Sequence, residues 1–307
     1  MKLSPDYENY LEEKLTVITG AARSGTSIVG KIVGSLEDCY YSFEPLSFTL
    51  IVQLVENNYL PFDQGKELIK GILFEDIFLQ AIHGRNINFN ERDDSYIGNY
   101  MDIEEIKEKW KKFRRRRDVL DYLERNDILF VIKIPNLQPC MKTLKKMFPK
   151  IKFIHMVRNG NDVISSSMKR GFYTREYLNN RNVDCWSIKE GKKSIMIPWY
   201  VKDKNFPDWN HQTRCAHIWR VLNEEYLDYK KENSDSVLNV KLEKMIENPE
   251  FILNSIENKM EKKRTDITIN HLKSIRNFTS PDYPDNTKYI INQEVDKYKE
   301  TSRKLGY

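Results

Sequence analysis

The stretch from residue 15 to residue 36 restricts the fold more than any other part of the chain. It reads LTVIT, then GAARSGTS, then IVGKIVGSL, which is a β-branched run, a glycine-bearing turn and an amphipathic segment. A strand that turns into a helix in this way leaves backbone N–H groups unpaired at the helix N-terminus, where the helix dipole also favours negative charge. We therefore expect an α/β fold in which the loop from Gly20 to Ser27 binds an anion.

The loop has the spacing of the nucleotide-binding pattern GxxxxGK[ST], except that Thr26 stands at the lysine position. Enzymes that hydrolyse nucleoside triphosphates use that lysine to hold the β- and γ-phosphates, so its absence argues against this class. Arg23 supplies a cation on the other side of Gly25, and Thr26 and Ser27 supply hydroxyls. This set suits a single phosphate beside a second charged group, and the alternative is a turn that binds nothing.

Short runs rich in β-branched or aromatic residues alternate with longer helical segments. The runs cover residues 15–19, 39–43, 128–133, 151–157 and 236–240. This alternation predicts a P-loop-type central parallel sheet flanked by helices. Three of the predicted strands end in Lys133, Arg158 and Lys241, where a nucleotide hydrolase would place an aspartate to organise Mg²⁺, so we expect no metal.

The length of 307 residues suits one α/β domain, residues 1–307, with two long helical or loop insertions. The insertions cover about 45–127 and 171–213, and segments of this length usually build substrate sites or lids. Residues 214–230 carry Trp219, Tyr226 and other apolar side chains at helical spacing, which predicts a core helix.

A second candidate anion site follows the run IKFIHMV. Arg158 comes directly after it, and a helical segment then carries Ser166, with Asn161 or Asp162 as the expected N-cap. Arg158 and Ser166 could therefore converge on one phosphate. The alternative is a strand-ending arginine that pairs with Asp162.

Together, the two sites resemble the sulfotransferases that use 3′-phosphoadenosine 5′-phosphosulfate (PAPS). The resemblance is strongest with the carbohydrate O-sulfotransferases, and it leaves out residues 50–125 and 171–213. Two departures are Arg158-Asn159-Gly160, where an Arg-Asp-Pro type of sequence is usual, and Arg23, where the small-molecule branch has lysine. The matching segments are ARSGTSIVGKIVGSLEDCYYSFEPLSF, KIPNLQPCMKTLKKMFPKIKFIHMVRNGNDVISSS, VLNVKLEKMIENP and KLGY.

The resemblance implies that PAPS is the sulfuryl donor. In the family the first loop grips the 5′-phosphosulfate, and a later arginine and serine hold the 3′-phosphate. Carried over to this chain, the donor-binding residues are Arg23, Ser24, Gly25, Thr26, Ser27, Arg158 and Ser166.

In-line sulfuryl transfer needs a base for the acceptor hydroxyl and positive charge at the leaving oxygen. Glu44 is the favoured base because it follows a predicted strand at the carboxyl edge of the sheet, where ligands of α/β proteins gather. His83, in the first insertion, is the alternative, whereas His155 lies inside a predicted strand and is expected in the core. Arg23 would stabilise the leaving side, and Lys133 either contacts the sulfonate or pairs with an acid.

Composition limits the partners. The net charge of +5 favours anionic ligands without the bias of a nucleic-acid binder. The basic run Arg114 to Arg117 has acidic neighbours and predicts a solvated helix face, although it and the pair Lys192–Lys193 would also tolerate an anionic acceptor.

The sequence shows no signal peptide and no apolar run of about 20 residues, so we expect a cytoplasmic protein without a membrane span. The four cysteines lack metal or disulfide spacing and are expected to be reduced thiols.

The sequence thus predicts a sulfotransferase that acts on a hydroxyl of a small molecule or saccharide, with a carbohydrate favoured. Two alternatives stay open: a degenerate P-loop kinase or nucleotide hydrolase, and a catalytically silent module that binds a nucleotide or glycan. The acceptor, its position of sulfation and the oligomeric state are not specified by these patterns.

Overall fold

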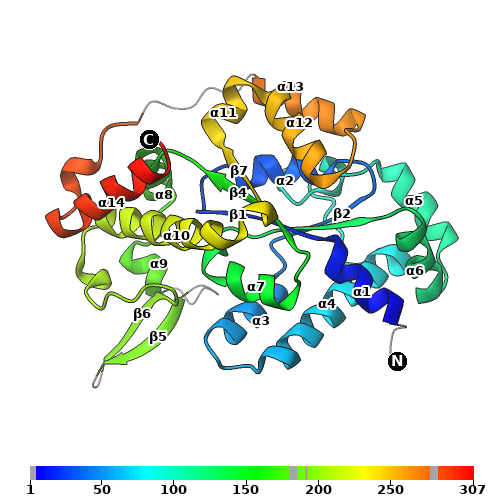
Figure 1. Cartoon of the computed structure of the whole chain (residues 1–307), viewed down its shortest axis with the longest axis horizontal. Helices are drawn as coiled ribbons and strands as arrows, with labels where there is room; N and C mark the ends of the chain where they lie inside the picture. The colour runs from blue at the N-terminus through cyan, green and yellow to red at the C-terminus, as the bar shows by residue number, and fades with distance from the viewer. Residues whose placement is uncertain (1–4, 180–184, 191–192, 277–282) are drawn as a thin grey trace.

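A five-stranded sheet forms the centre of the computed structural model, which describes residues 5–179, 185–190, 193–276 and 283–307 (Figure 1). The strand order is β2-β3-β1-β4-β7, and every neighbouring pair is parallel. The prediction of a central parallel sheet is confirmed, and no predicted strand end is displaced by more than one residue. The strands are β1 (Leu15–Gly20), β2 (Cys39–Phe43), β3 (Leu129–Lys133), β4 (Lys152–Val157) and β7 (Val237–Lys241).

The central strands are buried on both faces, which explains their nearly continuous apolar sequences. Along β1 the side chains of Leu15 and Val17 enter the core on one face of the sheet, and Ile18 enters the core on the other. All six residues of β1 are buried, whereas β2, at the edge of the sheet, is only partly covered.

Helices cover both faces of the sheet (Figure 1). One layer consists of α2 (Thr26–Gly34), α11 (Leu242–Glu247), α12 (Pro249–Met260) and α13 (Asp266–Arg276). The opposite layer contains α1 (Pro5–Lys14), α3 (Leu46–Glu56), α4 (Phe62–His83), α6 (Arg116–Arg125), α7 (Met141–Met147), α8 (Gly160–Lys169) and α10 (His211–Asn233).

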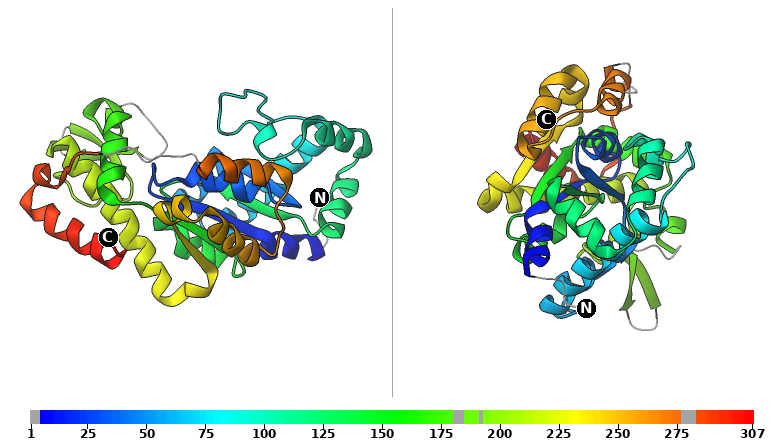
Figure 2. Two further views of the ribbon diagram at one scale, coloured as in Figure 1. Left: turned by 90° about the horizontal axis from the view of Figure 1, so that it is seen from above. Right: turned by 90° about the vertical axis from the view of Figure 1, so that its right-hand side faces the viewer.

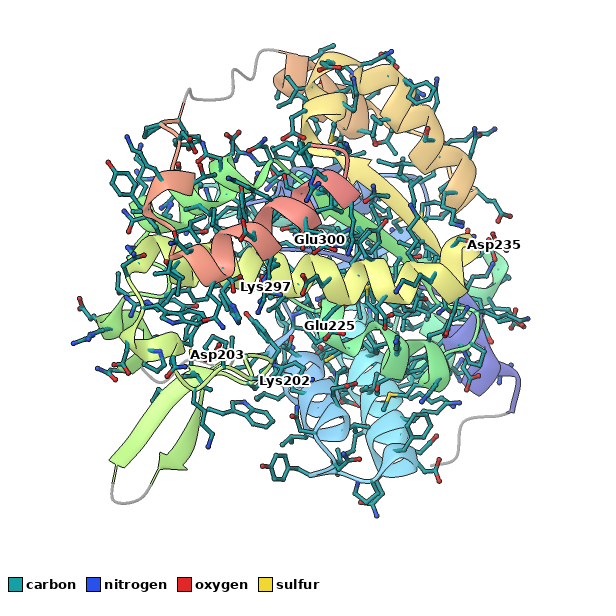
Figure 3. All side chains as sticks on the ribbon, turned by 60° about the vertical axis from the view of Figure 1, so that its left-hand side comes forward. Lys202, Asp203, Glu225, Asp235, Lys297 and Glu300 are labelled. Atoms are coloured by element: carbon teal, nitrogen blue, oxygen red, sulfur yellow. The ribbon has the colours of Figure 1, made fainter. Side chains whose placement is uncertain are left out.

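The last helix, α14 (Asn292–Lys304), packs on α10 through one face. Its Tyr298 and Thr301 are buried, whereas Lys297 and Glu300 are exposed (Figure 3). This alternation is the pattern expected of a helix that covers a core. Short 3₁₀ turns complete the connections: η1 (Ile97–Asn99), η2 (Gln138–Cys140), η3 (Phe206–Asp208), η4 (Ser234–Ser236) and η5 (Thr287–Tyr289).

The two insertions differ in structure. The first is mainly helical, as predicted, and comprises α3, α4, η1, α5 (Ile103–Lys112) and α6. The second contains α9 (Arg175–Asn179) and an antiparallel hairpin of β5 (Cys185–Glu190) and β6 (Lys193–Pro198), which projects from the body of the molecule (Figure 2). We did not predict this hairpin, because its short strands lie in a sequence that is rich in charged residues.

The core prediction for α10 is confirmed. Trp219 and Tyr226 of α10 are each 1% exposed, and the four cysteines are buried free thiols. His155 is buried in β4, where its ring stacks on that of Tyr226 at 3.6 Å and lies 3.3 Å from the Asn239 side chain. Burial lowers the pKa of His155 to about 3, so this histidine is a neutral core residue and not a base. Among the described residues, no helix combines the length and the apolar character that a bilayer span requires.

Candidate functional site

A cleft of about 460 Å³ lies at the carboxyl edge of the sheet. Because β1 to β4 are parallel, the segments that follow each of them end at this edge and bring residues from distant parts of the chain together. Of the predicted site residues, all of them described, Ser24, Ser166 and His83 lie outside the lining. The predicted residues that line the cleft are Arg23, Gly25, Thr26, Ser27, Glu44, Lys133 and Arg158.

The first loop has a fixed backbone shape. Arg23 and Gly25 have left-handed φ angles of 75° and 94°, and the Ser24 N–H donates to the Ala21 carbonyl at 3.0 Å. A Cβ atom at Gly25 would lie 2.9 Å from Leu242 Cδ1, so both the φ angle and the space favour glycine there. Helix α2 then begins at Thr26, and its N-terminus faces the cleft.

Asn136, which the sequence analysis missed, holds this loop against the sheet. Its Oδ1 accepts a hydrogen bond from the Ala22 N–H at 2.8 Å, and its own N–H donates to the Gly20 carbonyl at 2.9 Å. Asn136 has a left-handed φ of 60°, which asparagine tolerates better than most residues. Its place in the segment Lys-Ile-Pro-Asn, just after β3, was the available signal.

Ser24 is a buried residue of the loop and does not line the cleft. Its side chain is 1% exposed, and its hydroxyl has no hydrogen-bond partner among the described residues. Thr26 and Ser27, in contrast, line the cleft from the first turn of α2. Within the first loop and the start of α2, the hydroxyl residues that line the cleft are therefore Thr26 and Ser27.

Arg23 is the exposed cation of the cleft. Its Nε donates to Ser166 Oγ at 3.0 Å, and in the described part of the chain it forms no ion pair with a carboxylate. Burial of part of the guanidinium, followed by the positive charges of Arg170 and Arg158, lowers the pKa of Arg23. A cation whose neighbours are other cations suits the binding of a multiply charged anion.

Arg158 directly follows β4, and it forms hydrogen bonds with three separate segments of the chain. Its Nη1 donates to the Arg23 carbonyl at 3.3 Å, its Nη2 lies 3.1 Å from Asp162 Oδ2, and its own carbonyl accepts from Trp219 Nε1 at 3.2 Å. The pairing with Asp162 that we had considered as the alternative is thus present. Arg158 is only 6% exposed, yet it also lines the cleft.

The start of α8 corrects one detail of the sequence analysis. The N-cap is Asn159, whose Oδ1 accepts from the Asn161 N–H at 2.9 Å, and neither Asn161 nor Asp162 has this role. The helix can begin this early because Gly160 fits against Tyr298, where a Cβ would lie 2.6 Å from the tyrosine hydroxyl. Ser166 lies on the second turn, where its Oγ accepts a hydrogen bond from Arg23 Nε at 3.0 Å.

Glu44 and Lys133 form an ion pair at the opposite wall of the cleft. The Lys133 side chain is 1% exposed and its ammonium lies 3.7 Å from the centre of the Phe43 ring, whereas the Glu44 side chain is 45% exposed. Burial lowers the pKa of Lys133, and the carboxylate of Glu44 opposes this shift. Glu44 has a positive φ of 48°, and its N–H donates to the Lys133 carbonyl at 2.8 Å, so the end of β2 carries local strain at this residue.

A second ion pair of the cleft was not predicted. Lys31 of α2 lies 2.8 Å from Asp94, which belongs to the first insertion. Burial alone would raise the pKa of Asp94, but Lys31, with Ser27 and Lys133, lowers it below its ordinary value. Residues 50–125 showed no pattern that could have identified Asp94.

The other predicted candidates lie elsewhere. His83 is exposed at the last residue of α4. Arg115 pairs with Asp118 at 2.9 Å, and Arg116 and Arg117 pair with Glu75 and Asp121, so most of the basic run belongs to a solvated helix face. In the pair Lys192–Lys193, Lys192 lies outside the described residues.

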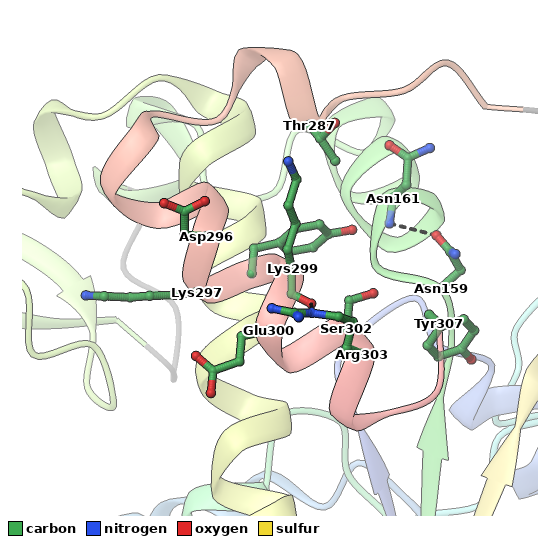
Figure 4. Close-up of a pocket in the computed structure, with 11 residues that line it drawn as sticks. Asn159, Asn161, Thr287, Asp296, Lys297, Lys299, Glu300, Ser302, Arg303 and Tyr307 are labelled. Atoms are coloured by element: carbon green, nitrogen blue, oxygen red, sulfur yellow. Dashed lines mark hydrogen bonds between the residues drawn. The ribbon is translucent and has the colours of Figure 1, made fainter.

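Another hollow, of about 700 Å³, lies between the start of α8 and helix α14 (Figure 4). Its walls carry cations, such as Lys299 and Arg303, together with the acids Asp296 and Glu300. None of the predicted site residues lines it. The hollow therefore lacks the convergent positive charge of the first cleft.

The ligand set of the cleft is cationic. Among the residues that the structure describes, no group of three or more His, Cys, Asp or Glu side chains is arranged to hold a metal ion. The cleft instead combines backbone N–H groups, the hydroxyls of Thr26 and Ser27 and the side chains of Arg23, Lys31, Lys133 and Arg158. This arrangement can bind an anionic substrate and can neutralise charge that develops on a leaving group.

Comparisons with known proteins agree with this geometry. A model of the sulfotransferase family matches residues 16–266, which include both anion-binding segments. No curated protein matches the sequence. The fold is similar to the sulfotransferase domain of the Synechococcus PCC 7002 olefin synthase, with a TM-score of 0.51 and 15% identity over 95% of this chain and 94% of that domain. It is equally similar to the sulfotransferase domain of the curacin biosynthetic pathway, with a TM-score of 0.51 and 13% identity over 95% of this chain and 97% of that domain.

Proposed function

Because the chain belongs to the sulfotransferase family, we propose that it transfers a sulfuryl group from PAPS to a carbohydrate hydroxyl, with Glu44 as the base. The observation that carries this proposal is that the half-exposed carboxylate of Glu44 and the first loop line the same cleft. The carboxylate and the loop supply the two requirements of sulfuryl transfer, a proton acceptor and a site for the leaving phosphate.

The donor would lie along the first loop. The N-terminus of α2, the hydroxyls of Thr26 and Ser27 and the guanidinium of Arg23 are suited to a phosphosulfate group. Ser166 and Arg158 are linked to Arg23 by hydrogen bonds, so the same region also suits a second phosphate such as the 3′-phosphate of PAPS.

Lys133 and Arg23 have separate tasks in the proposed reaction. Arg23 stabilises the negative charge that grows on the leaving oxygen, and the ion pair with Lys133 holds the Glu44 side chain in position. Glu44 then accepts the proton of the acceptor hydroxyl as that oxygen attacks sulfur. A sugar hydroxyl is less acidic than a phenol, so it gains more from a carboxylate base that is held close to it.

The first insertion supports a saccharide acceptor. A pocket of about 250 Å³, here called the polar pocket, lies beside Glu44 and includes both of its neighbours, Phe43 and Pro45. Tyr41 and Tyr100 stack at 4.2 Å in its wall. Aromatic faces mixed with amides and hydroxyls are suited to a sugar, which has both C–H and O–H groups. The polar residues of the polar pocket are Ser42, Asp76, Gln80, Asn86, Asn88 and Ser95. We propose that residues 1–307 act as one domain in which this insertion builds the acceptor site.

The test is a competition assay with PAPS that carries a labelled sulfuryl group, with and without a metal chelator. The acceptor mixture contains phenols, sterols, tyrosine peptides, and neutral and acidic oligosaccharides, and mass spectrometry identifies the products. Label in the saccharides, unchanged by the chelator, is the expected result. Label confined to phenols or sterols would refute the carbohydrate acceptor. Turnover that requires Mg²⁺ would favour a kinase-like enzyme, and binding of the desulfated product PAP without any transfer would indicate a silent module.

A further inference from the structure

A partly open pocket of about 100 Å³, here called the apolar cavity, lies behind the edge strand β2 and beneath helices α4, α5 and α6. A space with mainly apolar walls suits an apolar group of a ligand. Its walls include Ile77, Ile97, Ile106, Phe113 and Val119.

One residue in the wall of this cavity carries a buried polar atom without a partner. Tyr40, on β2, lines the cavity, and its buried hydroxyl forms no hydrogen bond within the described part of the chain. Burial raises the pKa of Tyr40, so the group stays a neutral hydroxyl that can donate or accept. A buried hydroxyl without a partner is destabilising, and a bound molecule with a polar atom near Tyr40 would remove that cost.

The apolar cavity and the polar pocket share walls. Gln80, Ile87 and Ile97 line both of them. The polar pocket in turn borders the cleft, because Phe43 and Pro45 flank Glu44, and Ser95 follows Asp94. The three spaces therefore follow β2 in order, from Glu44 at its carboxyl end to Cys39 and Tyr40 at its amino end.

From this arrangement, and resting on the proposed function, we propose that the acceptor is an amphiphile whose polar head carries the reacting hydroxyl and whose short apolar substituent occupies the apolar cavity. Glu44 follows Tyr40 by four positions, which corresponds to about 13 Å along a strand. This length fits one sugar ring with a short tail. Since a cavity of roughly 150 Å³ holds a benzene ring, the smaller cavity here suits a linear group of about four carbons.

The first experiment measures the binding of n-alkyl glycosides, from methyl to hexyl, by calorimetry in the presence of PAP, and their kcat/KM with PAPS. Each buried methylene should increase affinity about fourfold up to about the butyl compound, after which the series should level off. A flat series in the wild-type protein would overturn the proposal. Calorimetry separates the amphiphile proposal from the proposed function. Sulfuryl transfer without a chain-length effect on binding would refute only the amphiphilic acceptor. A chain-length effect on binding without transfer would refute only the proposed function.

Variants locate the effect in the apolar cavity. Ala81 lines it from α4, and Ala81→Leu adds three carbons to the wall, so the chain-length series should become flat. Leu68→Phe, on the exposed part of the same helix, is the matched control and should retain the wild-type series. A wild-type series in Ala81→Leu would refute the assignment of the tail to this space.

A second variant does not depend on filling the core. Tyr40→Phe removes only the unpartnered hydroxyl and keeps the ring. The measured quantity is the ratio of the dissociation constants of a 4-hydroxybutyl glycoside and the pentyl glycoside of similar length. This ratio should favour the hydroxybutyl compound more strongly in the wild-type protein than in Tyr40→Phe. An unchanged ratio of the two dissociation constants would exclude contact between the tail and Tyr40.

Discussion

Replacement of Asn136 by aspartate adds a negative charge to the cleft with little change of shape. The carboxylate can still accept the hydrogen bond from the Ala22 N–H, and aspartate tolerates the left-handed φ of 60° as asparagine does. Asn136 is 9% exposed and lines the cleft, so the new charge is only partly screened by solvent. Any anion bound by the loop is thereby repelled.

The size of the effect follows from Coulomb's law. At about 6 Å and an effective dielectric constant of about 20, two unit charges repel each other by about 3 kcal/mol, which corresponds to roughly a 100-fold increase in the dissociation constant of PAP. Calorimetric titration with PAP measures this directly, and thermal unfolding without PAP checks that the loop is intact.

Asn248→Asp is the matched control for this experiment. Asn248 caps α12 by accepting a hydrogen bond from the Phe251 N–H at 3.2 Å, it does not line the cleft, and aspartate is an equally good N-cap. The control carries the same change of charge and should bind PAP like the wild type. Equal PAP affinity in Asn136→Asp and Asn248→Asp would refute the assignment of the cleft as the anion site.

Three other predictions follow from the same geometry. Arg158→Ala should abolish most of the rise in melting temperature that PAP causes, because Arg158 supports both Arg23 and the second phosphate position, and an unchanged rise would exclude the 3′-phosphate assignment. Glu44→Gln should retain PAP binding but lower turnover by about 10²-fold or more, and near-normal turnover would show that Glu44 is not the base. The free energy of unfolding should fall by about 2 kcal/mol between pH 7 and pH 5 from His155 alone, because its pKa is about 3 in the folded protein and near 6.5 when unfolded, so the unfolded chain binds the extra proton. Denaturant titrations of His155→Gln should show a shallower pH dependence over this range, and equal slopes would contradict the assignment.

The sheet could be predicted because its strands are dictated locally. Each is a short run of β-branched and aromatic residues, and burial on both faces makes the run continuous, as in β1 and β4. The first loop was recognisable for the same reason, since Gly20, Gly25, Thr26 and Ser27 lie within eight consecutive residues of the chain.

The missed residues depend on contacts between distant segments. The pair of Lys31 with Asp94 joins α2 to the first insertion, and no local pattern specifies such a contact. Asn136 acts through a hydrogen bond to Ala22, which lies 114 residues earlier in the chain. The hydrogen bond between Arg23 and Ser166 likewise joins segments 143 residues apart, and no local pattern specifies it.

The strand order also has a consequence for the synthesis of the chain. Strand β1 pairs only with β3 and β4, and Arg23 meets Ser166, which is 143 residues farther along. Since ribosomes add about 5 to 20 residues each second, roughly 7 to 30 seconds pass between the appearance of the two residues. Until β3 and β4 are made, the apolar β1 has no neighbours, and the proposed donor site is incomplete until Ser166 follows. The proposed donor therefore could not stabilise the growing chain at this stage, and the exposed β1 segment is suited to chaperones that bind nascent polypeptides.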